Sequence, residues 1–204
     1  RKRFGRAIWL AVDVCLCSST PHGHCGVLNP EGDHLDNAAS VKELAAAAVA
    51  YAAAGADCVA PSDMMDGRIG AIREALARAG LERTLVMSYA AKFHSNFYGP
   101  FRVAADSAPK GAAIAAGLTD RASYQIDPAR AGDAILCVQR DVDEGADILM
   151  VKPGLPYLDL LSDLSREFAQ PWAVYEVSGE YAGIELLAEQ GLANRIGAHR
   201  EAWT

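Results

Sequence analysis

Residues 145–154 read GADILMVKPG, and residues 55–63 read GADCVAPSD. In both segments Gly-Ala-Asp closes an amphipathic helical stretch, and a short, almost wholly apolar run follows. Glycine commonly ends a helix, and a strand that is buried on both faces of a parallel sheet appears as a continuous apolar run. The same junction at two distant points predicts a chain that alternates helices with parallel strands.

The rest of the chain continues this alternation. Asn37 is expected to cap one helix, which Gly55 ends, and Asp127-Pro128 is expected to open another, with proline at its first position. The predicted strands are residues 7–14, 57–60, 84–88, 148–151 and 173–177. The predicted helices are residues 37–55, 67–79, 127–144, a stretch after Pro156, and 180–190.

These elements predict the α/β class with a parallel sheet covered by helices. Polar residues follow almost every strand, which favours a (β/α)8 TIM barrel, because a barrel gathers the ends of its strands into one mouth. No Gly-rich dinucleotide fingerprint follows a strand, which argues against a doubly wound sheet. A closed barrel needs eight strands and this chain supplies five, so either the sheet is open or the barrel is partial.

Composition narrows the function classes. With 51% hydrophobic and 22% charged residues, the 204-residue chain is an ordinary globular sequence. Its net charge of −7 gives no electrostatic reason to bind nucleic acid. No apolar run is long enough to span a bilayer and no secretory leader is visible, so we expect a cytoplasmic protein without a membrane partner.

Two lysines follow neighbouring predicted strands. Lys152 comes directly after the apolar run ILMV, and Lys92 lies four residues beyond Ser88. Burial and the mutual repulsion of two ammonium groups each lower a lysine pKa, and a neutral amine is the form that makes a Schiff base with a carbonyl. A single lysine there is more often a salt-bridge partner. A pair at adjacent strand ends favours Schiff-base chemistry.

Three of the five cysteines lie in residues 13–26, DVCLCSSTPHGHCG. Cys15, Cys17 and Cys25 have the spacing C-x-C-x7-C, with two histidines just before the last thiol. Three interpretations stay open: buried thiols, a structural zinc closed by a histidine, or a three-thiolate zinc with an open fourth position. Three thiolates on Zn²⁺ leave a net charge of −1, which suits polarising a substrate better than generating hydroxide. The other two cysteines are assigned to the core.

A long connection, residues 93–121, follows the third predicted strand. It is too long for a simple turn and is rich in glycine, alanine and aromatic residues, as expected of an active-site lid. Arg102 and Arg121 lie in it, and Gln125 follows. Arginine forks onto carboxylates, although an isolated arginine is more often a surface ion-pair residue.

Six segments together resemble the porphobilinogen synthase, or 5-aminolevulinate dehydratase, family. They are DVCLCSSTPHGHCG, APSDMMDGR, MSYAAKFHSNFYGPFR, SYQIDP, MVKPGLPYLD and VYEVSGEY, within residues 6–190. The resemblance implies a (β/α)8 barrel that condenses two 5-aminolevulinate molecules into porphobilinogen, in tetrapyrrole and haem synthesis, and a homo-octamer when full length. Residues 1–204 would then be one partial barrel domain covering about strands 3 to 7.

The resemblance also implies roles for individual residues. Lys152 matches the Schiff-base lysine of the first substrate, and Lys92 matches the lysine that engages the second. The substrate-binding positions are Arg102, Arg121 and Gln125 for the second carboxylate, Ser178 for the first, and Asp13, Ser62 and Asp63 along the pocket. Cys15, Cys17 and Cys25 match the zinc-dependent branch of the family.

The chain also departs from the family pattern. Nothing in it matches the N-terminal arm used in octamer assembly or the eighth strand, so we expect an internal fragment. The lid is lengthened at residues 111–120. Cys137 stands where many bacterial members carry a glutamate for an allosteric magnesium, so that site is not expected. Ser123 stands where some members have a cysteine that helps His24 bind a second zinc.

Two competing interpretations remain. Another Schiff-base-lysine barrel, such as an aldolase, would need one imine lysine and no thiolate zinc. An inactive, zinc-stabilised fragment would keep the cysteines without turnover.

Overall fold

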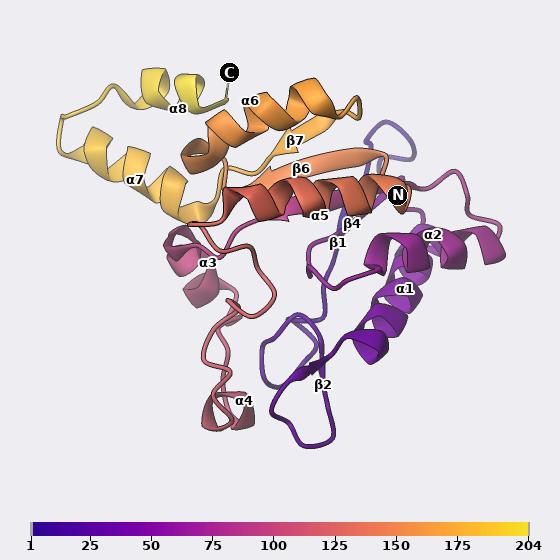
Figure 1. Ribbon diagram of the computed structural model, residues 1–204. Coiled ribbons are helices and arrows are strands. Elements are labelled where there is room, and N and C mark those ends of the chain that lie inside the picture. Colours follow the sequence, from indigo (N-terminus) through magenta and orange to yellow (C-terminus); the bar gives the residue numbers. More distant parts are fainter. Residues whose placement is uncertain (1, 204) are drawn as a thin grey trace.

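Five parallel strands form the main sheet of the computed structural model, which describes residues 2–203 (Figure 1). They are paired in the order β1 (Ala11–Val14), β4 (Cys58–Pro61), β5 (Leu85–Lys92), β6 (Ile148–Lys152) and β7 (Trp172–Val174). The spatial order is the chain order, so each strand lies beside the one before it. The predicted α/β class and the parallel sheet are confirmed.

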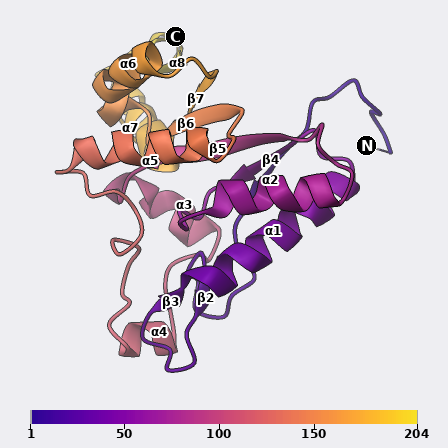
Figure 2. The same ribbon diagram turned by 45° about the vertical axis from the view of Figure 1, so that its right-hand side comes forward.

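Helices follow the strands in alternation. The longer ones are α1 (Asn37–Ala53), α2 (Arg68–Arg78), α5 (Ala131–Asp143), α6 (Leu158–Glu167), α7 (Ser178–Glu189) and α8 (Arg195–Trp203). Short elements are the antiparallel pair β2 (Val27–Leu28) and β3 (Leu35–Asp36), the 3-10 turns η1 (Asn96–Tyr98) and η2 (Leu155–Tyr157), and helices α3 (Gly99–Ala104) and α4 (Ala112–Ala115). The β2–β3 pair and α4 extend together beyond one end of the sheet (Figure 2).

The two faces of the sheet are packed differently. One large buried cluster joins α1, α2, α5 and α6 to alternate strand residues such as Val59, Val86 and Leu149. The opposite face carries a small cluster around Ala60, Tyr89 and Met150. Successive strand residues point to opposite faces, so the apolar strand sequences supply both clusters at once. The second face is the one that a closed barrel would turn inward.

The two Gly-Ala-Asp junctions have the same geometry. Gly55 and Gly145 end their helices with φ of 103° and 96°, a left-handed conformation that glycine adopts without strain. The aspartate that follows then reaches the neighbouring strand. Asp57 Oδ2 accepts a hydrogen bond from Leu10 N at 2.8 Å, and Asp147 Oδ2 accepts one from Val86 N at 2.8 Å. Each junction therefore ends a helix and ties the next strand to its predecessor.

Two predicted helix starts are wrong. The N-cap of α1 is Asp36, whose side chain accepts from Ala39 N at 2.9 Å, while Asn37 instead bonds the backbone of Asp66. Helix α5 begins at Ala131, because Asp127 first makes a turn in which its side chain accepts from Ala129 N. The Asp-Pro pair therefore precedes the helix.

Strand lengths also differ from prediction. Strand β1 begins at Ala11 and β7 ends at Val174, both shorter than expected. Strand β5 is longer and runs to Lys92, with an irregularity in its pairing to β6 between Ser88 and Ala91. Within residues 2–203, no helix is both long and apolar enough to cross a lipid bilayer.

Candidate active site

The two predicted lysines face each other across neighbouring strands. Lys92 and Lys152 are register partners at the ends of β5 and β6, so their side chains leave the sheet on the same face. Lys92 is 5% exposed, and its Nζ donates a hydrogen bond to the carbonyl oxygen of Ser62 at the end of β4. Lys92 is the last residue of β5, whereas the strand predicted from the sequence ends at Ser88.

Lys152 lies among aromatic rings. Its Nζ is 3.6 Å from the ring centroid of Tyr175, 5.2 Å from that of Tyr89 and 5.7 Å from that of Tyr98. Burial, followed by repulsion from Lys92, lowers the pKa of Lys152 to about 7, although Asp13 opposes the shift. Near neutral pH, a large share of Lys152 is therefore the unprotonated amine that attacks a carbonyl carbon.

The three predicted cysteine ligands come together. The Sγ atoms of Cys15, Cys17 and Cys25 all lie within 4.8 Å of one another, and those of Cys15 and Cys17 are 3.2 Å apart. Cys25 is fully buried, and the other two are half-buried. Hydrogen bonds from the other two thiols, aided by Lys92 and Arg121, lower the pKa of Cys25 well below its usual range. These three side chains could hold a metal ion.

Neither nearby histidine completes this group. His24 is fully buried, and its ring nitrogens bond Tyr124 Oη at 3.1 Å and the carbonyl oxygen of Leu118 at 3.0 Å. His22 Nδ1 accepts from His24 N at 3.1 Å. Of the three interpretations left open by the sequence, a zinc closed by a histidine is therefore not the arrangement seen here.

The predicted lid connection, residues 93–121, and the four residues after it are together called the lid from here on, and they carry the predicted cationic groups. Arg121 is 6% exposed, and its Nη2 donates to the carbonyls of Ser107 at 2.6 Å and Gly23 at 2.9 Å. The guanidinium of Arg102 lies 5.7 Å from the ring centroid of Tyr98.

Several buried polar atoms of the lid have no hydrogen-bond partner in the described part of the chain: Nε and Nη2 of Arg102, Nε of Arg121, and both amide atoms of Gln125. Buried polar atoms are normally paired. Unpaired donors from two arginines therefore suit a bound anion.

The remaining predicted residues lie around the same strand ends. Asp63 is fully buried, its Oδ1 accepts from Met65 N at 2.7 Å, and burial raises its pKa to about 6. Asp13 lies on the exposed edge strand, near enough to Lys152 to raise the pKa of that amine. Ser178 is the first residue of α7, and its Oγ accepts from Phe101 N at 2.9 Å.

Two supporting groups were not assigned roles from the sequence. The carboxylate of Glu180 accepts from the backbone N–H groups of Leu155 and Val177, both at 2.6 Å, and so fixes the chain just after Lys152. Behind β5, the buried Arg68 donates to Asp141 and Ser88, at 2.9 and 3.1 Å from its Nη2. The sequence carried a signal for Arg68, because this charged residue shares the buried side of α2 with Ile72 and Leu76.

Comparison with known proteins identifies the family of the chain. The family model described as "Delta-aminolevulinic acid dehydratase" matches residues 1–204. The chain belongs to this family. Curated relatives of the same name are 49% identical in Macaca fascicularis, covering 100% of this chain and 60% of that protein, and 47% identical in Bacillus subtilis, covering 89% and 53%.

A solved structure of the family is also similar. It is the delta-aminolevulinic acid dehydratase (porphobilinogen synthase) of Toxoplasma gondii in complex with the reaction product porphobilinogen. The TM-score is 0.92 at 41% identity, covering 98% of this chain and 55% of that one. The five-stranded sheet is therefore part of a TIM barrel, as the sequence predicted. The chain spans only part of the length of its curated relatives: 60% of the protein from Macaca fascicularis, 53% of that from Bacillus subtilis and 52% of that from Methanothermobacter thermautotrophicus.

Proposed function

We propose that the whole protein is a porphobilinogen synthase, which condenses two 5-aminolevulinate molecules to porphobilinogen with loss of two waters. The observation that carries the proposal is the facing pair Lys92 and Lys152, with the pKa of Lys152 lowered to about 7. Family membership and the three neighbouring thiols support it. The reaction needs no oxidant or reductant, since the two substrates equal the product plus two waters.

The first step uses the neutral amine of Lys152. It attacks the ketone carbon of the first substrate, a C–N bond forms, and the ketone oxygen leaves as water to give a Schiff base. Lys92 engages the ketone of the second substrate in the same way. The carbonyl oxygen of Ser62 accepts a hydrogen bond from Lys92 and holds this amine beside the first. The two former ketone carbons, now in Schiff bases, are thereby held next to each other for the bonds that join the two substrates.

The substrate carboxylates would meet the lid and helix α7. Arg102, Arg121 and Gln125 are proposed to bind the second carboxylate, because their unpaired buried atoms are suited to an anion. Ser178 at the N-terminus of α7 is proposed to bind the first. Asp13, Ser62 and Asp63 would line the pocket between them.

The metal is proposed to be zinc, held by Cys15, Cys17 and Cys25. Three thiols of which one is already strongly acidified fit a thiophilic ion and do not fit magnesium, which prefers oxygen. When bound, such an ion orients and polarises a substrate carbonyl or amine. The resemblance also supports one barrel domain and a homo-octamer. The departure from the family pattern at Cys137 argues against an allosteric magnesium site there.

The test is product formation from 5-aminolevulinate, combined with borohydride reduction. The whole protein should form porphobilinogen and, when it is reduced under single-turnover conditions, carry its first substrate-derived adduct on Lys152. Lys152→Arg keeps the cation but cannot form an imine, so trapping and turnover should both disappear. An aldolase-type barrel would trap its substrate yet make no porphobilinogen and be indifferent to chelators. Failure to form porphobilinogen, or activity that a chelator leaves unchanged, would reject the proposal.

A further inference from the structure

His24 connects two segments that the sequence places far apart. The cysteine loop, defined as residues 15–26, holds the three thiols, and the lid supplies Leu118 and Tyr124. Both ring nitrogens of His24 are bonded to lid atoms, at 3.1 Å to Tyr124 Oη and 3.0 Å to the carbonyl of Leu118. The side chain is fully buried, so water does not compete for these bonds.

The directions of these bonds follow from chemistry. A carbonyl oxygen only accepts, so Nε2 carries the proton that is shared with Leu118. When the imidazole is neutral, Nδ1 then accepts from the Tyr124 hydroxyl, whose oxygen accepts in turn from Cys25 N at 3.4 Å. The result is one continuous chain of donors from the metal-binding residue Cys25 to the lid, with no ring nitrogen left over for a metal.

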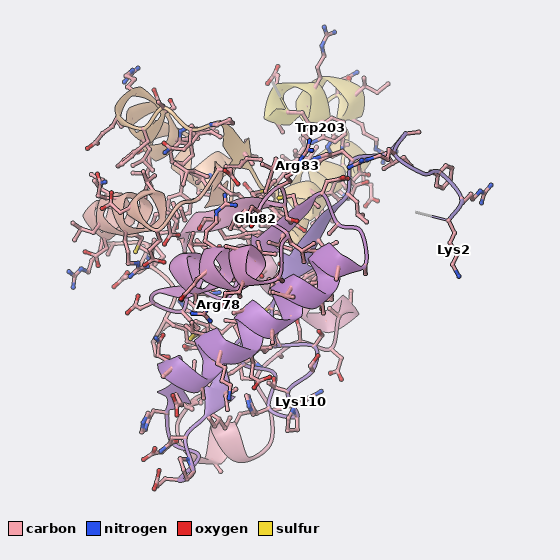
Figure 3. All side chains as sticks on the ribbon, turned by 90° about the vertical axis from the view of Figure 1, so that its right-hand side faces the viewer. Lys2, Arg78, Glu82, Arg83, Lys110 and Trp203 are labelled. Atoms are coloured by element: carbon pink, nitrogen blue, oxygen red, sulfur yellow. The ribbon has the colours of Figure 1, made fainter. Side chains whose placement is uncertain are left out.

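Further contacts hold the same two segments together. Arg121 donates to the carbonyl of Gly23 at 2.9 Å, and Lys110 N donates to the carbonyl of His22 at 3.1 Å. A Cβ on Gly23, whose φ is 74°, would come within 2.6 Å of the carbonyl oxygen of Ala108. Figure 3 shows Lys110 beside α4, at the opposite end of the molecule from Trp203.

We propose that His24 and Tyr124 are positioning residues that couple the metal centre to the lid. Metal bound by the cysteine loop fixes Cys25, the donor chain transmits this order to Tyr124, and Tyr124 holds Arg121 and Gln125 on either side of it in the lid. By thermodynamic linkage, an ordered lid raises metal affinity by the same factor. This inference rests on the metal site of the proposed function.

The test deletes one atom. Tyr124→Phe keeps the ring but removes the hydroxyl that links Cys25 to His24, and Tyr51→Phe on helix α1 is the matched control. Zinc affinity is measured by chelator competition on the whole protein, and lid order by the rate of tryptic cleavage after Lys110, whose side chain is 46% exposed. His24→Ala, which removes the other half of the link, is measured in parallel.

In the unsubstituted protein and in Tyr51→Phe, zinc should slow cleavage after Lys110 by about tenfold, within the usual range of coupling between sites. In Tyr124→Phe and His24→Ala, this protection should largely vanish, and zinc affinity should fall by a similar factor. KM for 5-aminolevulinate should rise while borohydride trapping on Lys152 persists, because the lid residues next to Tyr124, Arg121 and Gln125, are proposed to bind the second substrate.

The outcomes separate the two proposals. If zinc binds the three cysteines but protects the lid equally in Tyr124→Phe and in the unsubstituted protein, the coupling is rejected and the proposed function stands. If the unsubstituted protein binds no zinc, the metal assignment of the proposed function fails and the coupling fails with it.

Discussion

Lys152 shows how a single residue acquires reactivity from its position. It ends a buried strand, faces a second cation, and lies against three tyrosine rings, so its ammonium form is poorly solvated. The lowered pKa means that the reactive neutral amine accumulates as the pH rises through about 7. We expect the rate of single-turnover borohydride trapping to rise with pH and to be half-maximal near pH 7.

An ordinary exposed lysine titrates about three pH units higher. A trapping profile that is still rising above pH 9 would show that the environment of Lys152 does not activate it. Lys92→Arg serves as the comparison, because it keeps the neighbouring positive charge and should leave the midpoint nearly unchanged.

Cys25 is the thiol on which metal binding should depend most. It is fully buried and its pKa is lowered, so it supplies a thiolate at little energetic cost. Cys25→Ser should weaken zinc binding by more than about 100-fold, since even groups behind a ligand contribute 10- to 100-fold. Isothermal titration against a competing chelator measures this affinity.

Cys137→Ser on helix α5 is the control and should bind zinc with unchanged affinity. Equal zinc affinity in the two variants would show that the cysteine loop does not bind the metal.

The sequence predicted that certain residues come together where chemistry and sequence position coincide. Lys92, Lys152 and the three clustered cysteines stand out because each is chemically unusual next to an apolar strand or a polar loop. His24 was visible as a ligand candidate, yet its partners lie about a hundred positions away, at Leu118 and Tyr124. A contact between two irregular segments leaves no periodic signal in the sequence.

At the level of elements, a buried ion pair fastens helix α2 to helix α5 and strand β5. Arg68, Asp141 and Ser88 are all fully buried, and both oxygens of the Asp141 carboxylate bond the guanidinium. Removing Asp141 takes away the closest carboxylate of the buried guanidinium and leaves it with Asp63, 3.9 Å from its Nε. We expect Asp141→Ala to lower the free energy of unfolding of the whole protein by about 3–5 kcal/mol, measured by denaturant titration.

The matched control is an exposed ion pair on α2, the helix that carries Arg68. Arg78 and Glu74 are bonded one turn apart with more than 60% of each side chain exposed, so Arg78→Ala should change stability by less than about 1 kcal/mol. The double variant Arg68→Met with Asp141→Leu should recover much of the loss. If the double variant is as unstable as Asp141→Ala, the loss of stability comes from altered packing and not from a guanidinium left without its closest carboxylate.

Elements were predicted well where a strong local signal exists. The repeated Gly-Ala-Asp junction located β4 and β6, because a left-handed glycine and a strand-tying aspartate are both encoded locally. The end of β5 was missed. Its continuation to Lys92 depends on pairing with β6 after an irregularity, which is decided by a strand far along the chain. Similarly, Asp36 and Asn37 are both good caps, and only the contact of Asn37 with Asp66 separates them.

At the scale of the whole molecule, the two open edges of the sheet decide how the chain should behave in solution. Strand β1 pairs only with β4, and β7 only with β6, within the described residues. Apolar side chains next to both edges are exposed, including Trp9 at 52% and Val174 at 45%. Such edges pair readily with other chains. The 204-residue chain by itself should therefore self-associate with rising concentration in analytical ultracentrifugation, and a monomer with a sharp thermal transition would contradict this.

The sheet order has a consequence for how the protein is made. Because β1, β4, β5, β6 and β7 pair in the order of the chain, each strand after β1 leaves the ribosome when one neighbour on which it docks has already been made. Within the described residues, β1 alone has to wait for a partner that is translated later, which is β4. The lid lies in the longest interval, between β5 and β6, but closing a long loop adds only about 0.6 kcal/mol for each doubling of its length. An insertion as long as the lid can therefore be accommodated at this point without changing the order in which the strands pair.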